Sequence, residues 1–266
     1  MPRQAWRILL LIVLAAVSLQ IFFAARIALM AVLPPQSTTF QRTEMSRLLR
    51  EQGRILWAQE WRGYGAISSY AKRAVIASED AGFVDHHGVE WDALEKAWNR
   101  NSRAQQRVNE QRLKAMERYE RAVARATKRG RAPPEPPSAL NATPKVVGGS
   151  TITQQLAKNL FLSSERNFVR KGQEFAITFM LEGLLGKERI LEIYLNNVEF
   201  GEGVFGIQAA SRHYFHVDAD QLSRLQAARL AVMLPAPKRF EKTPRSGYVS
   251  SRAGTVAARM NAVELP

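Results

Sequence analysis

The chain of 266 residues contains no cysteine. Disulfides and thiolate metal ligands are therefore excluded. Acidic residues are also scarce, because 24 Asp and Glu stand against 38 Lys and Arg, which gives a formal net charge of +14. A chain with this balance favours anionic partners, namely nucleic acid, anionic lipid or a phosphorylated substrate.

Most of the excess positive charge lies between Trp98 and Val146. This segment holds twelve Lys and Arg against four Glu, a net charge of +8. It has few aromatic side chains that could stack on bases, so we expect no nucleic-acid partner. The stretch from Arg103 to Arg129 is polar almost all round and predicts an exposed helix held by ion pairs, which a proline-rich stretch then ends. We interpret residues 99–146 as a basic surface insertion, flexible or hairpin-like.

One long uncharged apolar run is present, from Ile8 to Ala25. A helix of roughly 20 apolar residues spans a bilayer core. Two arginines precede the run and no acidic residue appears before Glu44, so we expect the N-terminus in the cytoplasm and the rest of the chain outside. A cleaved signal peptide is the alternative, but the run is longer than a typical signal core. Residues 1–36 are thus predicted to form a cytoplasmic tip and a transmembrane anchor.

A first cluster of polar residues, EDAGFVDHHG, runs from Glu79 to Gly88 at the end of a predicted helix. A carboxylate at a helix–loop junction could serve as a general base. The simpler interpretation is that two acidic residues end a helix and face water, and the cluster alone favours that interpretation. The histidine pair could bind a metal, but no partner spacing supports zinc.

A second cluster, GGSTITQQLAKN, runs from Gly148 to Asn159. Ser150 is the predicted N-cap of the helix that follows. On that helix Thr151, either of the two glutamines at 154 and 155, and Lys158 share one face. Hydroxyl and amide groups suit a sugar and the lysine suits a phosphate, although an ordinary solvated face would have the same residues.

A third cluster surrounds Glu174. Arg166, Arg170 and Lys171 lie within one or two helical turns of this carboxylate. They could form a surface ion-pair ladder of little energetic value, or a cationic cradle beside a second functional carboxylate. Further along, glycines at 201, 203 and 206 indicate a loop, and no β-ladder is expected anywhere in the chain.

Together these clusters resemble the family 51 glycosyltransferases, which polymerise peptidoglycan. The strings that carry the resemblance occur in the family's order and cover Ser69 to Pro237 apart from the insertion: EDAGFVDHHG, GGSTITQQLAKNLF, RKGQEFAITFMLE with KERILEIYLNNVEFG, GVFGIQAASRHYF, and LQAARLAVMLPAP. The similarity is greatest to the monofunctional form. It implies a mainly α-helical, lysozyme-like, two-lobed domain over residues 37–266, with a larger lobe, a smaller membrane-proximal lobe and a cleft between them.

The resemblance also implies roles for individual residues. Glu79 would be the base that activates the GlcNAc 4-hydroxyl of lipid II, and Glu174 would be the second catalytic carboxylate. The remaining matched positions would bind or orient the lipid-linked substrate: Asp80, Phe83, His86, Ser150, Thr151, Gln154, Lys158, Asn159, Arg166, Arg170 and Lys171. Lys158 and Arg166 would hold the diphosphate. A Mg²⁺ or Mn²⁺ ion at the diphosphate stays open, because the sequence offers no dedicated metal cage.

Two other functions fit parts of the sequence. A lysozyme-type glycan-cleaving enzyme also uses carboxylates, but it must protonate a glycosidic oxygen. A basic membrane adaptor would explain the apolar run and the insertion, but not the ordered motifs. The resemblance instead implies an enzyme of the cytoplasmic (inner) membrane with its catalytic domain on the outer, periplasmic side, and cell-wall transpeptidases as candidate partners.

Overall fold

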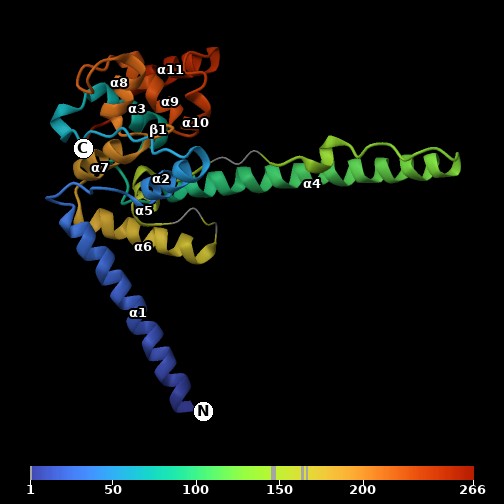
Figure 1. Ribbon diagram of the computed structural model, residues 1–266, viewed down its shortest axis with the longest axis horizontal. Helices are drawn as coiled ribbons and strands as arrows, with labels where there is room; N and C mark the ends of the chain where they lie inside the picture. Colours follow the sequence, from blue (N-terminus) through green and yellow to red (C-terminus); the bar gives the residue numbers. More distant parts are fainter. Residues whose placement is uncertain (1, 145–147, 163–164, 166) are drawn as a thin grey trace. The chain divides into compact units, whose positions relative to one another are not determined.

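The computed structural model describes residues 2–144, 148–162, 165 and 167–266 (Figure 1). It divides into two compact units, one made of residues 1–89 with 151–266 and the other of residues 90–150. Helices make up nearly all of the regular structure in the part of the chain that is described. The predicted mainly α-helical fold class is therefore confirmed.

The first helix of the larger unit, α1, spans Pro2–Leu29. Its segment Gln4–Leu29 contains an 18-residue window with a mean hydropathy of 2.7, and it is the one helix in the described ranges that is long and apolar enough to cross a membrane. The last turns pack against α6, Phe168–Leu184, where the side-chain amides of Gln20 and Gln173 pair at 2.8 Å. Most of the apolar surface of α1 nevertheless lies exposed.

The core of the larger unit is built around α7, Lys187–Asn197, whose residues from Ile190 onward are nearly all buried. Helices α3, α9 and α11 pack together, and α5 packs against α2, α6 and α7. Their bounds are α2 Thr39–Gln52, α3 Ser69–Glu79, α5 Ile152–Phe161, α9 Arg224–Met233 and α11 Gly247–Arg259. Shorter helices complete the unit: η1 Tyr64–Ala66, α8 Ile207–Phe215, α10 Pro237–Phe240 and η3 Met260–Ala262.

The glycine-rich stretch expected to be a loop contains a small antiparallel sheet. Strands β1, Glu199–Gly201, and β2, Val204–Phe205, pair with each other, so the expectation of no β-ladder was wrong. Gly206 follows β2 with a φ of +79°, and a Cβ there would lie 2.6 Å from the backbone oxygen of Asn196. Glycine therefore permits both the turn and the close approach to α7.

The smaller unit is a helix paired with an extended return. Helix α4 spans Trp91–Lys128, and the chain then runs back beside it through the short helix η2, Ser138–Asn141 (Figure 1). The predicted exposed helix is confirmed and is longer than expected. One face of α4 carries small side chains that are buried or partly buried: Ala93, Ala97, Ala104, Val108, Ala115, Ala122 and Ala126. The return passes this face closely, since a Cβ on Gly149 would lie 2.9 Å from the Cβ of Ala97.

A second face of α4 carries a line of basic side chains, which we call the basic stripe. Its ten members are Lys96, Arg100, Arg103, Arg107, Lys114, Arg118, Arg121, Arg125, Lys128 and Arg129. They follow one another at spacings of three, four or seven, and Arg129 comes directly after Lys128 as the C-cap of the helix. At about 100° per residue they therefore fall within an arc of roughly 100°. All ten side chains are exposed.

Candidate active site

Glu79 is the last residue of α3, and its carboxylate is partly buried. The carboxylate accepts a hydrogen bond of 2.9 Å from the side-chain amide of Gln155 on α5. The amide oxygen of Gln155 in turn accepts the hydroxyl proton of Tyr194 at 2.9 Å, which fixes the orientation of the amide. Burial raises the pKa of Glu79 above its ordinary value, and the charge of Asp80 adds to this, whereas the hydrogen bond from Gln155 opposes it.

The neighbouring carboxylate, Asp80, is buried and fully engaged. One oxygen accepts the backbone N–H of Ile152 at the start of α5 at 2.9 Å, and the other lies 2.8 Å from Nε2 of His86. Nδ1 of His86 accepts the backbone N–H of Gly88 at 3.1 Å, so Nε2 carries the proton that points to Asp80. Asp80 and His86 thus tie the loop after α3 to the N-terminus of α5, and Glu79 is the more exposed carboxylate of the pair.

The N-cap of α5 lies one residue later than predicted. The side-chain oxygen of Thr151, and not that of Ser150, accepts the backbone N–H of Gln154. The backbone N–H of Thr151 in turn donates to Oε1 of Gln154 at 3.1 Å. The hydroxyl of Thr151 also donates to the backbone oxygen of Gly88 at 2.6 Å. This capping box fixes α5 against the loop that carries Asp80. Ser150 is exposed and belongs to the smaller unit.

Two predicted substrate-binding residues are almost completely buried. Phe83 has no exposed surface and lies under the ammonium group of Lys187, which is 4.5 Å from the ring centroid. Gln154 is 1% exposed and serves the capping box. The structure gives both residues a packing role, and their direct contact with substrate stays a prediction. Gln155, which does reach Glu79, was considered on the polar face of α5 but was not among the residues assigned to the site.

A cleft of about 610 Å³ lies beside the end of α5. Lys158 and Asn159 line it from α5, and Arg170 lines it from α6. The opposite wall comes from α2, which contributes Arg47 and Arg50 together with two carboxylates. The cleft is therefore rich in cations, as a diphosphate would require, and α2 is a part of the site that the sequence motifs did not indicate.

Glu174 is 3% exposed and holds two cations on α6. Arg170 bonds one carboxylate oxygen at 3.0 Å and Lys171 contacts the other. Arg170 also lines the cleft. The cluster is therefore an ion-pair ladder on α6, as in the first interpretation, and one of its cations, Arg170, faces the cleft, as in the second. Arg166 lies outside the described residues.

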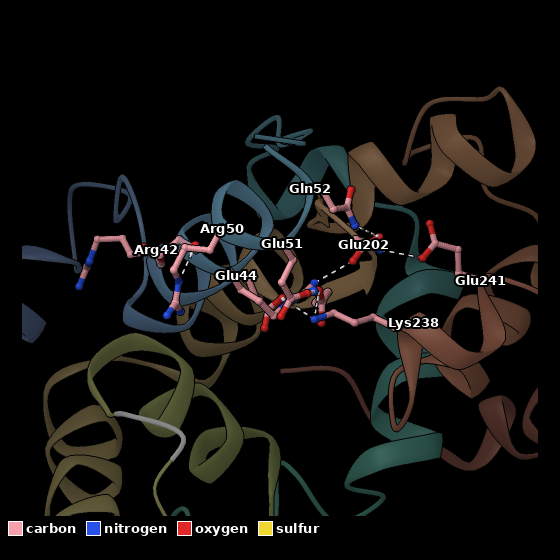
Figure 2. Close-up of polar contacts among 11 residues, drawn as sticks. Arg42, Glu44, Arg50, Glu51, Gln52, Glu202, Lys238 and Glu241 are labelled. Carbon is pink, nitrogen blue, oxygen red and sulfur yellow. Dashed lines mark hydrogen bonds and ion pairs between the residues drawn. The ribbon is translucent and has the colours of Figure 1, made fainter. Parts of the chain in front are cut away.

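An ion-pair network holds α2 in place. Arg47 bonds Glu44 at 2.9 Å, Glu51 at 2.6 Å and Glu202 at 2.8 Å. Figure 2 shows Lys238 reaching from α10 to Glu44. Glu202 accepts a hydrogen bond from the side-chain amide of Gln52 at 3.1 Å, and its backbone N–H donates to the carboxylate of Glu241 at 2.8 Å (Figure 2). This network positions the cationic wall of the cleft.

Glu199 of β1 lies beneath this network. It is 7% exposed, and its Oε1 lies 3.6 Å from the ammonium group of Lys238 and has no hydrogen-bond partner. Burial raises the pKa of Glu199 to about 7, although the charge of Lys238 opposes the rise.

Among the described residues, no three His, Asp or Glu side chains lie close enough together to hold a metal ion. Protein side chains alone therefore do not define a metal site in this part of the chain.

These features define a mainly helical protein with a partly buried carboxylate at Glu79 and a cleft whose lining carries four cations and two carboxylates. The chain belongs to the transglycosylase family, because the family model described as Transglycosylase matches residues 49–111 and 138–261. The match leaves out residues 112–137, the distal half of the α4 hairpin.

Curated relatives agree with this family. The biosynthetic peptidoglycan transglycosylase of Cupriavidus metallidurans is 47% identical over 263 residues, which cover 96% of this chain and 95% of that protein. That of Burkholderia pseudomallei is 46% identical over 93% of this chain and 82% of the relative. That of Bordetella pertussis is 40% identical over 97% and 93%, respectively. The predicted family and the predicted enzyme class, a peptidoglycan glycosyltransferase, are therefore confirmed.

Proposed function

We propose that this enzyme transfers a lipid-diphosphate-linked glycan chain onto the GlcNAc 4-hydroxyl of lipid II. Glu79 takes the hydroxyl proton as the oxygen attacks the anomeric carbon of the donor. The bond from that carbon to the diphosphate breaks, and its electron pair leaves with undecaprenyl diphosphate. A sugar hydroxyl is a weak nucleophile at neutral pH, so a positioned base is required. Attack from the face opposite the leaving group inverts the configuration and gives a β-1,4 bond.

The observation that supports this proposal most directly is that the two adjacent carboxylates, Glu79 and Asp80, have different environments. Asp80 has both oxygens committed to His86 and Ile152, whereas Glu79 is partly exposed and has a raised pKa. A raised pKa makes Glu79 a stronger base once it is ionised.

The leaving diphosphate needs cations more than a proton. Lys158 and Arg170 line the cleft, and Lys171 contacts Glu174 next to it. We assign diphosphate binding to Lys158 and Arg170, and the positioning of Arg170 to Glu174. The predicted contribution of Arg166, and that of a divalent ion, stay predictions.

We further propose that α1 spans the cytoplasmic membrane with the N-terminus inside and the catalytic domain, residues 37–266, on the outer side. The length and hydropathy of α1 support the span, and the arginines that precede the apolar run support the orientation. Residues 99–146 would be an insertion into that domain, and cell-wall transpeptidases stay the predicted partners.

Polymerisation of labelled lipid II by the full-length enzyme tests the proposal. We expect glycan strands from the wild type, none from Glu79→Gln, and inhibition by moenomycin. Cleavage of preformed glycan without polymer formation would instead identify a lysozyme-type activity. Absence of both activities in a folded wild type would favour an adaptor.

A further inference from the structure

The basic stripe is a one-sided, solvent-facing line of charge. From Lys96 to Arg129 it extends for about 50 Å at 1.5 Å per residue. Within the described residues it makes one ion pair, Arg121 with Glu117 at 3.9 Å, in which both side chains are well exposed. Exposed pairs of this kind neutralise little. Of the acidic residues of α4, Glu95, Glu117 and Glu120 fall outside the arc of the stripe. Glu110 falls at the edge of the arc, in the gap between Arg107 and Lys114, so the stripe carries one acid among its cations and stays strongly positive.

The stripe is separate from the apolar surface of α4. The large hydrophobic side chains that α4 exposes are Trp91, Trp98, Leu113 and Met116. At about 100° per residue they fall on a common line roughly 150° around the helix from the centre of the stripe. A helix that inserts into a membrane interface carries its basic residues on the flanks of an apolar face, which is not the arrangement here. No aromatic residue lies within the stripe to stack on bases, which argues against a single-stranded nucleic acid.

We propose that the basic stripe binds the surface of an anionic lipid bilayer through electrostatic contact alone. A planar anionic surface can meet ten collinear cations at once, whereas a folded acidic partner would need a straight acidic strip of matching length. A transmembrane α1 would keep the arm at high local concentration near a bilayer. The stripe continues into residues 112–137, which the family model does not match, so this contact is distinct from the shared catalytic machinery.

The absence of cysteine allows a direct test in the full-length chain. Gln111 lies beside the stripe, and Asn109 lies on the other side of α4, about 200° around the helix; both are exposed. A fluorophore is attached to Gln111→Cys or to Asn109→Cys in protein reconstituted into phosphatidylcholine vesicles with or without phosphatidylglycerol. Quenching by spin-labelled lipid headgroups measures how close each position lies to the bilayer. We expect strong quenching at 111 only with phosphatidylglycerol, weaker quenching at 109, and loss of the difference at high salt.

Two charge variants of the labelled protein complete the test. Changing Arg103, Arg107, Lys114 and Arg118 to Gln removes four charges from the stripe and should weaken the docked state by about 100-fold or more. The matched control changes four exposed basic residues elsewhere to Gln and should leave quenching unchanged: Lys242, Arg245, Arg252 and Arg259. Circular dichroism verifies that α4 stays helical in both variants. Equal quenching at 111 and 109, quenching independent of phosphatidylglycerol, or equal loss in both variants would overturn the proposal and leave an acidic protein as the candidate partner.

Discussion

The side-chain amide of Gln155 donates a hydrogen bond of 2.9 Å to the carboxylate of Glu79. This bond joins the second ordered motif of the sequence to the first, across the junction of α3 and α5. It stabilises the ionised form of the proposed base, which burial disfavours.

The first prediction concerns the base itself. Glu79→Gln keeps the size of the side chain and removes its basicity. We expect lipid II turnover to fall by about 10²–10⁴-fold with unchanged circular dichroism, because general-base catalysis contributes a factor of this size. Near-normal polymerisation by the folded variant would show that another group accepts the proton.

The second prediction concerns pH. A base is active when deprotonated, so kcat/KM should fall as the pH decreases through the raised pKa of Glu79, above its ordinary value of 4.5. Gln155→Leu removes a donor that lowers this pKa, so the acidic limb of the profile should move to higher pH. The control is Gln155→Glu measured at the same pH values, in which a second carboxylate should move the limb further upward. A limb that stays in place in both variants would contradict the assignment of the limb to Glu79.

The third prediction concerns the cations next to the leaving group. Lys158→Ala and Glu174→Gln should each lower turnover severely. Lys158→Arg should restore activity only in part, because a planar guanidinium does not replace a compact ammonium. Donor affinity, measured by displacement of a labelled lipid-diphosphate inhibitor, separates binding from chemistry. Full activity and affinity in Lys158→Ala would move the diphosphate site elsewhere.

The fourth prediction concerns α2, which the motifs did not indicate. Arg50→Ala removes a cation from the cleft wall and should raise KM more than it lowers kcat. Arg42→Ala is the matched control, because Arg42 lies on the same helix but bonds Ser37 and does not line this cleft. Equal effects of the two substitutions would mean that α2 acts through its overall positive charge and that Arg50 makes no specific contact with the substrate.

The fifth prediction concerns the stability of the junction between β1 and α2. An acid whose pKa is raised by folding stabilises the protein below its unfolded pKa and loses that contribution as the pH rises through the folded pKa. For Glu199 the window runs from about 4.5 to about 7. Glu199→Gln should therefore be more stable than the wild type above pH 7, by up to about 3 kcal/mol, and equally stable near pH 4. Thermal unfolding across this range measures the difference, and a variant less stable at pH 8 would refute the burial argument.

The helices were predictable from sequence because their apolar spacing and caps are local. The N-cap of α5 shows how close competing signals can be, since Ser150 and Thr151 are both good caps. The deciding residue is Gln154, which lies three positions after Thr151 and completes the capping box. That signal was present in the sequence, but the position one residue earlier was preferred.

The sequence predicted the motifs around Glu79 and at the start of α5 separately, but not the contact between them. The bond between Asp80 and the backbone of Ile152 joins positions 72 residues apart, and no local pattern reports it. The role of α2 was hidden for a related reason. Its sequence is polar, and the ion pairs that hold it include Arg47 with Glu202 and Glu44 with Lys238, whose members lie 155 and 194 residues apart in the sequence. Long-range pairing of this kind becomes visible only in three dimensions.

The helical repeat of α4 also limits how the length of this arm can change. Removing seven residues from its middle would turn the outer half of the helix by about 20° relative to the inner half, so a continuous line of charge would survive. Removing two residues would turn it by about 200° and point the outer arginines away from the inner ones. Homologous arms that keep this surface should therefore differ in length by close to a whole number of helical turns, such as 4, 7, 11 or 18 residues. A deletion series in α4 should show binding that returns about once every 3.6 residues.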